Sequence, residues 1–519
     1  MGVFHVAQYL ERNPVTTTLL LGLTVLFGWR MISEFTSPLR QYPGPFLAKW
    51  TNIWRFCLVR TGSYHLHIRK LHEQYGPVVR IGPNHLDLDL PEIAKTLYGS
   101  DVNWRKTEFY QNNSILINGK IIYTLFSEIN PLKHVNIKRP IAKFFSQGNV
   151  LAKEVLVDAV IQNMCKQLEN RSERQSCDLG EWIAFCAWDI LGNLAFGQSL
   201  GYLDKGCDHD GSIRATDKSL DYFAAIGQMP WMDHVLDKNP VVHLGPPNLE
   251  NITRIATEHM VKRLQSKDPA HPTTTPDYLQ HFVDIKKEQP DTVTELDVII
   301  YLLTTLIAGA DTTAITIRAI FYHALRTAPS RCLRTPSAYR KLEEEILSTK
   351  LGEPAQYNSS RALPYLEAAV REGMRMHPSV CMLLERYVPE SGLTLPDGRY
   401  VPPSTAVGLN PYVIGRNKNI WGPDVDTFRP ERWLKNEGES EDSYRERLRL
   451  YNAADLTFGG GSHVCLGRYI AQLEVYKVVA TLIRNFEIEL SDPKREWQVV
   501  GSWFPRQKGL LCNLKRRAK

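Results

Sequence analysis

A glycine-rich loop around one cysteine constrains this 519-residue chain more than any other sequence feature. The loop reads Phe458-Gly-Gly-Gly-Ser-His-Val-Cys-Leu-Gly467. Because glycine has no Cβ, four glycines in such a short segment let the backbone run close to a neighbouring group, which we expect to be flat. An amphipathic helix is predicted from Arg468 onward, which places Cys465 at a helix N-terminus, where backbone N–H groups and the helix dipole stabilise a thiolate.

A thiolate held in this way serves as a metal ligand or as a nucleophile, and a structural cysteine in a tight turn is the third alternative. A nucleophile needs a base, and although His463 is two residues away, side chains so close in one loop rarely face each other productively. We therefore favour metal ligation by Cys465. The nine cysteines include no CxxC pair, which excludes the common zinc ribbons and fingers and indicates reduced thiols in a reducing compartment.

The segment Ala308-Gly-Ala-Asp-Thr-Thr313 falls at the end of an apolar run that is predicted to be a buried helix. The run opens at Thr294-Glu-Leu-Asp297, which resembles a capping box, and the uncharged stretch from Val298 to Ala310 is too short to span a bilayer. Burying an unpaired acid is costly, so a buried Asp311 should be paired or functional. The alternative is that the helix simply reaches the surface at Asp311.

Two further segments carry arginines. Leu363–Pro378 is predicted to be a helix of about three turns, since one proline suits its first turn and another ends it. Glu372 and Arg375 lie three residues apart and share a face of this helix. Phe428-Arg-Pro-Glu-Arg-Trp433 is predicted to be a loop because its proline opposes a helix. Alone, each segment would be an ordinary surface feature.

In their order and spacing these four segments resemble the cytochrome P450 family of haem-thiolate monooxygenases, from Tyr42 to the C-terminus. The positions that match the family's FxxGxRxCxG, [AG]Gx[DE]T[ST] and ExxR motifs are Phe458, Gly461, Cys465 and Gly467, then Ala308 to Thr313, then Glu372 and Arg375. Arg432 matches the arginine of the family's PERF-like element, so the resemblance implies a buried charge network of Glu372, Arg375 and Arg432. The implied fold is mainly α with small β-sheets (α+β).

The resemblance also implies a cofactor and a reaction. The cofactor is haem b with Cys465 as the axial thiolate ligand of the iron, which favours cleavage of the O–O bond. Asp311 and Thr312 would be the catalytic residues that deliver protons, and Gly309 would open a groove for dioxygen. One oxygen atom enters an apolar small molecule by hydroxylation, epoxidation or oxidative demethylation. The other becomes water, with electrons from an NADPH–cytochrome reductase and with cytochrome b5 as a further candidate donor.

The basic residues implied to bind the haem propionates depart from the family pattern. His463 stands where the family usually has an arginine, and it offers one hydrogen bond instead of a two-pronged contact. His134 and Lys138 replace the tryptophan and arginine of the family's WxxxR element. Arg386 resembles the remaining propionate-binding arginine. A solvated surface role is the alternative for His134 and Lys138.

The N-terminal segment is predicted to attach the protein to a membrane. Residues 13–29 are uncharged and lie between two arginines, which is about the minimum length for a membrane-spanning helix. We predict an anchor over residues 1–32, a proline-rich hinge over residues 33–46 and a catalytic domain over residues 47–519. The alternative is a cleaved signal peptide, which would need a basic start, a shorter apolar stretch and a cleavage site.

Together with the resemblance, the anchor predicts a single-pass protein of the endoplasmic reticulum membrane with a cytosolic catalytic domain. The net charge of +6, from 62 basic and 56 acidic residues, is too small to indicate a nucleic-acid partner. Aromatic and aliphatic segments are expected to form an apolar substrate pocket; they are residues 107–124, 222–235, 302–310, 380–384 and 502–505.

Two other functions fit parts of the pattern. A haem-thiolate isomerase or dehydratase works without O2 or a reductase, but such enzymes commonly lack the threonine at position 312. A non-catalytic haem-binding sensor would need neither Asp311 nor Thr312. Within the family, the cysteine loop and Tyr42-Pro-Gly-Pro-Phe46 resemble fungal enzymes of secondary metabolism such as the pisatin demethylase group.

Overall fold

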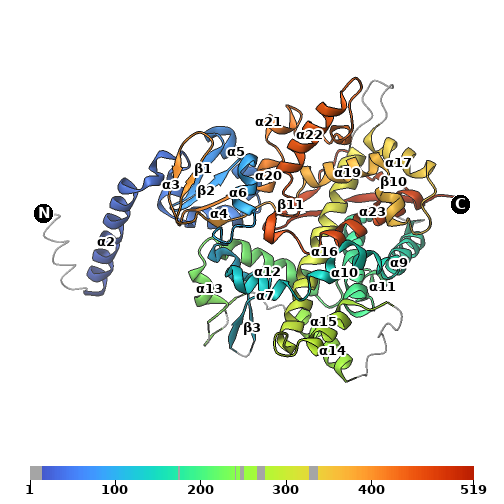
Figure 1. Cartoon of the computed structure of the whole chain (residues 1–519), viewed down its shortest axis with the longest axis horizontal. Coiled ribbons are helices and arrows are strands. Elements are labelled where there is room, and N and C mark those ends of the chain that lie inside the picture. The colour runs from blue at the N-terminus through green and yellow to red at the C-terminus, as the bar shows by residue number, and fades with distance from the viewer. Residues whose placement is uncertain are drawn as a thin grey trace.

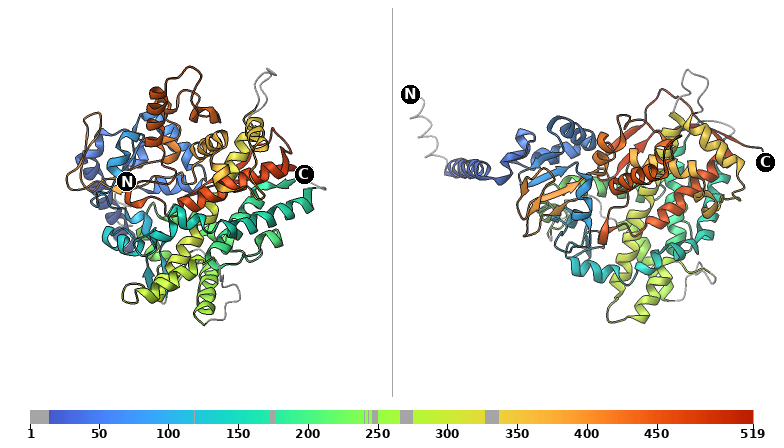
Figure 2. Two further views of the ribbon diagram at one scale, coloured as in Figure 1. Left: turned by 45° about the vertical axis from the view of Figure 1, so that its right-hand side comes forward. Right: turned by 45° about the horizontal axis from the view of Figure 1, so that its top comes forward.

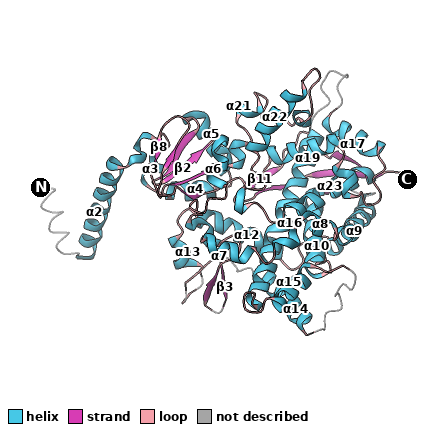
Figure 3. Cartoon of the chain, in the orientation of Figure 1, coloured by secondary structure: helices cyan, strands magenta, loops and turns pink. Residues whose placement is uncertain are grey.

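The computed structural model describes residues 14–117, 119–172, 176–239, 241–242, 244–245, 250–265, 275–326 and 337–518. Helices form most of the body, and the strands gather in small sheets (Figure 3). This confirms the predicted class of a mainly α protein with small β-sheets.

The α-helices are α2 (Pro14–Thr36), α3 (Phe46–Trp50), α4 (Ile53–Arg60), α5 (Tyr64–Tyr75), α6 (Ala94–Tyr98), α7 (Pro131–Lys138), α8 (Gln147–Leu151), α9 (Glu154–Ser172), α10 (Leu179–Phe196), α11 (Tyr202–Lys205), α12 (Ser212–Ile226), α13 (Trp231–Leu236), α14 (Glu250–Leu264), α15 (Tyr278–Glu288), α16 (Glu295–Arg326), α17 (Ala338–Ser348), α18 (Tyr357–Arg361), α19 (Pro364–Met376), α20 (Pro411–Ile414), α21 (Lys418–Trp421), α22 (Glu441–Ala454) and α23 (Arg468–Asn485). Short 3-10 helices are η1 (Pro38–Gln41), η2 (Pro91–Ile93), η3 (Glu108–Asn113), η4 (Ala142–Phe145), η5 (Pro430–Trp433) and η6 (Gly461–His463). The strands are β1 (Val78–Gly82), β2 (His85–Leu88), β3 (Ile115–Ile117), β4 (Lys120–Ile122), β5 (Cys177–Asp178), β6 (Arg386–Tyr387), β7 (Leu393–Thr394), β8 (Tyr400–Val401), β9 (Ala406–Leu409), β10 (Phe486–Leu490), β11 (Gln498–Gly501), β12 (Pro505–Lys508) and β13 (Leu511–Arg516).

Helix α16 is the central element of the body (Figure 1). It begins with the predicted capping box, since the Thr294 hydroxyl accepts from the Asp297 N–H at 3.2 Å and Asp297 accepts from the Thr294 N–H at 2.8 Å. It packs against α10, α19 and α23. Asp311 is buried, and the helix continues to Arg326, so the alternative that the helix surfaces at Asp311 is wrong.

The described residues contain one helix that is long and apolar enough to cross a membrane, and this helix is α16. Because 67% of its most apolar window is buried inside the protein, its apolar character is that of a core helix. No disulfide joins the cysteines that the structure describes, as expected for reduced thiols.

The largest sheet has the strand order β1-β2-β9-β6. Alternating apolar residues on both sides of Gly82-Pro83-Asn84 predict a hairpin, and β1 and β2 form it. Val79 lies opposite Asp87 in this antiparallel pair, and β9 joins β2 in parallel. The same pattern around Asp397-Gly398 predicts a second hairpin, which β7 and β8 form with Leu393 opposite Val401. The largest sheet lies at the end of the body from which α2 projects (Figure 1).

Helix α2 stands away from the body and is fixed to it at its C-terminal end (Figure 2). It runs to Thr36 and so enters the segment predicted as a hinge. Both guanidinium NH groups of the buried Arg80 on β1 donate to the Glu34 carboxylate, at 2.9 and 2.8 Å. The Arg80 N–H donates to the carbonyl of Pro43 at 2.7 Å, so the predicted extended proline segment is docked on the sheet.

Two polar stretches without apolar periodicity, residues 266–276 and 435–445, are predicted to be surface loops. Residues 435–445 correct this expectation in part, because α22 begins at Glu441. Ser440 caps the helix by accepting from the Ser443 N–H at 3.2 Å, and Glu441 pairs with Arg445 on the exposed face. These local contacts support a helix that has little apolar periodicity. The other stretch, residues 266–276, lies mostly outside the described residues.

Candidate functional site

Exposed atoms deep inside the body indicate an internal hollow beside α16. Ala308 is exposed although it lies in the middle of the core helix, and Thr312, one turn further on, is partly exposed. The Thr312 hydroxyl donates to the Ala308 carbonyl at 2.9 Å, so it stays on this face of the helix. Cys465 is also exposed, and the loop that carries it enters α23, which packs against α16.

The backbone of the cysteine loop is folded back on itself. The Cys465 N–H donates to the Phe458 carbonyl at 2.8 Å. Gly461 has φ +56°, and a Cβ there would lie 1.8 Å from the Tyr98 carbonyl oxygen. The close neighbour of Gly461 is therefore the chain's own backbone, which corrects the expectation of a flat group at this glycine. A Cβ at Gly467 would lie 3.9 Å from the Cys465 sulfur.

The thiol of Cys465 is surrounded by protein on the sides that do not face the hollow. Burial raises its pKa, while the Gly467 N–H and the charges of Lys138 and Arg468 act in the opposite direction. The expected stabilisation of the thiolate by a backbone N–H and by nearby positive charge is present. Without a further positive charge such as a bound metal ion, the cost of removing the thiolate from water outweighs this stabilisation.

Four of the sequence-predicted basic residues come together beside the cysteine loop. The rings of His134 and His463 are 4.3 Å apart between centroids. The Lys138 ammonium group donates to the Ser462 carbonyl at 2.7 Å. Within the described part of the chain, the buried Nε of Arg386 and Nδ1 of His463 have no hydrogen-bond partner. A buried arginine N–H without an acceptor, next to a histidine ring nitrogen that can also donate, indicates a binding site for an anion.

Lys106 belongs to this basic cluster and was missed in the sequence. Its ammonium group is buried and donates to the Phe126 carbonyl at 2.7 Å. Burial lowers the pKa of Lys106, and the neighbouring Arg386 lowers it further. The one signal in the sequence was a lysine between the aromatic residues Trp104 and Phe109.

The basic groups disfavour one another's charge. Burial lowers the pKa of His134 to about 3, and Lys106, Lys138 and Arg386 lower it too. The pKa of His463 is lowered for the same reasons, first by burial and then by Lys106 and Arg386. A pair of carboxylates placed among these groups would relieve the repulsion and accept the free N–H groups.

The side chains of Asp311 and Thr312 point away from α16 in different directions. Thr312 borders the hollow, whereas Asp311 accepts a hydrogen bond from the indole N–H of Trp188 on α10 at 3.1 Å. Burial raises the pKa of Asp311 to about 7, and the nearby Asp217 raises it as well. An acid with this pKa can both take up and release a proton near neutral pH.

Gly309 lies against α10. A Cβ at this position would lie 2.9 Å from Cδ1 of Leu191, so the absence of a side chain lets α16 and α10 approach each other. The structure thus gives Gly309 a packing role. Its expected role in a dioxygen groove stays a prediction.

The predicted charge network of Glu372, Arg375 and Arg432 is confirmed. Arg375 donates to both carboxylate oxygens of Glu372, at 2.9 and 2.8 Å. Arg432 donates to Glu372 from its Nε at 3.3 Å. Arg432 belongs to η5, a 3-10 helix where the sequence predicted a loop. All three side chains are buried, and the network borders the residues that lead into the cysteine loop.

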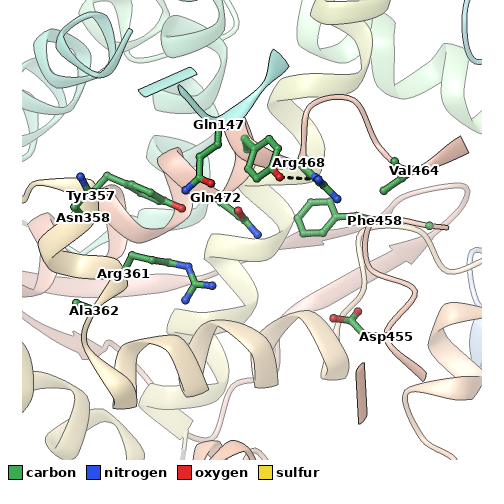
Figure 4. A pocket seen from close by; sticks show the side chains of 12 residues that line it. Gln147, Tyr357, Asn358, Arg361, Ala362, Asp455, Phe458, Val464, Arg468 and Gln472 are labelled. Atoms are coloured by element: carbon green, nitrogen blue, oxygen red, sulfur yellow. Dashed lines mark hydrogen bonds between the residues drawn. The ribbon is translucent and has the colours of Figure 1, made fainter. Parts of the chain in front are cut away.

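The outer side of the cysteine loop forms an open bowl of about 650 Å³ on the protein surface. Figure 4 shows Phe458 and Val464 of the loop facing Tyr357 and Arg361 of α18 across it. Arg468 at the start of α23 also lines the bowl and donates to the Tyr469 hydroxyl at 2.6 Å.

Comparison with known proteins identifies the family. The family model of cytochrome P450 matches residues 43–512. The chain belongs to the cytochrome P450 family. Members of this family hold a haem through a cysteine thiolate on its iron.

Three fungal relatives of this cytochrome P450 are themselves named as monooxygenases. Cytochrome P450 monooxygenase cfoH of Aspergillus candidus is 44% identical over 524 residues, 99% of this chain and 95% of that protein. Cytochrome P450 monooxygenase cicH of Emericella nidulans is 33% identical over 487 residues, 92% of this chain and 94% of that protein. Cytochrome P450 monooxygenase mpaDE of Penicillium brevicompactum is 33% identical over 484 residues, 92% of this chain, and this chain spans 55% of that longer protein. The expectation of a cytochrome P450 monooxygenase is confirmed, and the narrower likeness to the pisatin demethylase group stays a prediction.

The residues beside the hollow fit a haem. Its iron needs a ligand, and Cys465 exposes a thiol there. Its two propionates need cations and N–H donors, and the basic cluster presents Arg386 and His463 with buried donors that lack partners among the described residues. The donor set therefore suits a dianionic group bound through a sulfur.

Proposed function

We propose that this cytochrome P450 inserts one oxygen atom from O2 into an apolar small molecule of fungal secondary metabolism, using haem b bound by Cys465. The observation that carries the proposal is the pairing of an exposed thiol on an internal loop with a basic cluster in which two buried nitrogens, Nε of Arg386 and Nδ1 of His463, have no hydrogen-bond partner among the described residues. When bound, a haem with a thiolate ligand supplies activation of dioxygen.

We assign the haem contacts to the residues gathered around the cysteine loop. Arg386, His463, His134 and Lys138 hold the propionates, with Lys106 as an additional cation. Phe458, Gly461 and Gly467 shape the loop so that the sulfur faces the hollow. A histidine offers one N–H group to a propionate where an arginine offers two. We therefore expect His463 to bind its propionate more weakly than an arginine at this position would.

Proton supply is assigned to Thr312 and Asp311. Thr312 borders the hollow with a hydroxyl that can pass a proton on, while Asp311 has a pKa of about 7 and restores the proton from inside the fold. An isomerase or dehydratase of this kind would commonly lack the threonine, and a haem-binding sensor would need neither residue. The presence of a buried, near-neutral acid next to this threonine favours the monooxygenase.

An aromatic cluster supports an apolar substrate. Phe109 lies 4.7 Å from Phe223 and 5.5 Å from Trp503, and Phe126 lies 5.6 Å from Trp503, between ring centroids. These residues come from three of the segments expected to contact substrate and from the loop beside them. Rings packed in this way favour uncharged substrates with little hydrogen-bonding capacity.

We further propose that residues 1–32 anchor the protein in the endoplasmic reticulum membrane, with residues 47–519 as the cytosolic catalytic domain. In the view of Figure 1, α3 and α13 lie on the same side of the body as α2. They expose Phe46, Leu47 and Trp231, with 72%, 58% and 65% of their surface accessible. Such side chains suit a lipid interface.

A deletion of residues 1–32 tests the anchor, because it retains Glu34 and its ion pair with Arg80. The shortened protein should leave the membrane fraction while keeping its haem. Loss of haem on this deletion, or retention of the shortened protein in alkaline-washed membranes at the level of the full chain, contradicts a separable anchor.

Electrons are proposed to enter across the bowl outside the cysteine loop, from an NADPH–cytochrome reductase and also from cytochrome b5. Arg361 and Arg468 line this surface. Basic side chains around a concave face favour an acidic partner.

The function is tested with the full chain in membranes, an NADPH–cytochrome reductase and a panel of uncharged aromatic and terpenoid compounds under 18O2. A product that gains one labelled oxygen only when NADPH, reductase and O2 are all present supports the proposal. Conversion of a compound without O2 or NADPH would establish the isomerase alternative. A Thr312→Ala variant should consume NADPH while forming less product, and full coupling in this variant would contradict the proton assignment.

A further inference from the structure

The side chain of Trp188 forms a hydrogen bond with Asp311, the acid that is proposed to supply protons. It lies on α10, is one of the largest fully buried side chains, and donates from its indole N–H to Oδ1 of Asp311 at 3.1 Å. The second oxygen, Oδ2, is buried and has no hydrogen-bond partner among the described residues. The carboxyl group is therefore held by one oxygen and free at the other.

A partly exposed ion pair is close enough to this acid to influence its pKa. Asp217 on α12 and Arg506 on β12 both influence the pKa of Asp311. The Arg506 Nε lies 3.1 Å from Oδ1 of Asp217, whose side chain is 29% exposed. Next to Arg506, Gln507 donates to the Ile315 carbonyl of α16 at 3.0 Å, which fixes β12 one turn from Asp311.

We propose that Trp188 is a positioning residue for proton supply: its indole N–H fixes Oδ1 of Asp311 and leaves Oδ2 to exchange protons with the Asp217–Arg506 pair at the solvent edge. The inference rests on the proposed monooxygenase function. Each transferred proton comes from solvent through Asp217, binds Oδ2 of Asp311 and leaves from it toward the hollow, so the acid returns to its starting state.

The groups around Asp311 determine the direction in which its pKa shifts. Burial and the negative charge of Asp217 on α12 raise its pKa. The Trp188 N–H on α10, Arg506 on β12 and Arg318 on α16 itself lower it. The neighbouring Asp189 of α10 accepts the N–H groups of residues 201–203 and so serves the start of α11. Removing the indole N–H should raise the pKa of Asp311.

The test is an infrared titration of the purified, haem-loaded full chain. The carbonyl band of protonated Asp311 is identified by its loss in Asp311→Asn. In the native protein its midpoint should lie near pH 7, following the pKa of about 7. In Trp188→Phe, which keeps a ring but removes the donor, the midpoint should rise by about one unit, as expected for one hydrogen bond to a charged group.

Two controls keep the test decisive. Trp182→Phe makes the same change on the same helix and should leave the midpoint unmoved. Asp217→Asn alters a partly exposed side chain and should lower the midpoint, which tests the second half of the route even where Trp188→Phe fails to fold. An unmoved midpoint in both Trp188→Phe and Asp217→Asn, in protein with a normal thiolate carbon monoxide spectrum, overturns this inference alone. An abnormal spectrum in the native protein overturns the proposed function instead.

Discussion

Removing the charge of Glu372 should destabilise the protein strongly. Its carboxylate is fully buried and accepts from Arg375, Arg432, the Trp433 indole at 3.0 Å and the Arg429 backbone N–H at 3.1 Å. In Glu372→Gln the shape is kept, but two buried guanidinium groups lose their shared counter-ion. Breaking a buried ion pair on one side costs about 3–5 kcal/mol.

The lower end of that range is expected, about 3 kcal/mol, because both arginines keep other acceptors. Arg375 also donates to the carbonyls of Gly415 and Val425, at 2.7 and 2.9 Å, and Arg432 to Asp424 at 3.2 Å. Adding every bond to Glu372 at about 1.5–3 kcal/mol would overestimate the loss, since the amide oxygen of glutamine still accepts.

The assay is urea unfolding followed by far-ultraviolet circular dichroism, with haem content measured on the same samples. The midpoint should fall with an unchanged slope, and haem content should fall with it. Glu446→Gln is the matched control, because its partner Arg449 is 72% exposed and water screens the pair, so the unfolding midpoint should stay close to that of the native protein. A loss below about 1 kcal/mol in Glu372→Gln would refute the reasoning.

Three further predictions follow from single positions. Gly461→Ala should lose most of its haem in a folded protein, because the new Cβ collides with the Tyr98 carbonyl at a φ of +56°; full haem content by the pyridine assay would contradict this. The ordinary pKa of an aspartate is 3.8, whereas the pKa of Asp311 in the folded protein is about 7. Between these pH values the folded protein binds one more proton than the unfolded chain, so the free energy of unfolding falls as pH rises from about 4 to 7. Asp311→Asn should remove this fall, which amounts to about 3 kcal/mol between pH 5 and pH 8 in urea unfolding, and an unchanged pH dependence would contradict the burial argument. Gln147→Glu with Gln472→Glu adds two negative charges to the bowl and should slow NADPH-driven reduction about three- to tenfold at low salt, while dithionite reduction and the exposed control Gln289→Glu stay unchanged.

The elements that follow from local patterns could be predicted from the sequence. The capping box at Thr294, the prolines around Leu363–Pro378 and the turn at Gly82-Pro83-Asn84 are short-range signals, and each element appears where its signal lies. The resemblance then supplied what local patterns cannot, since Glu372 and Arg432 are 60 residues apart in the chain and meet only in the fold.

The contacts that could not be predicted are long-range and carry no motif. Trp188 is 123 residues from Asp311, and nothing in the sequence marks it as the partner of that acid. Lys106 joins the basic cluster through the placement of its loop. Helix α22 escaped notice because its support is a cap and surface ion pairs, while the periodicity of its apolar residues is weak.

The most direct test is the carbon monoxide difference spectrum of membranes that contain the full chain, reduced once with dithionite and once with NADPH and a reductase. Thiolate ligation by Cys465 predicts a strongly red-shifted Soret band under both conditions, and its loss in a haem-loaded Cys465→His variant. The same red-shifted band in the Cys465→His variant, or no such band in folded, haem-loaded native protein, would contradict Cys465 as the iron ligand.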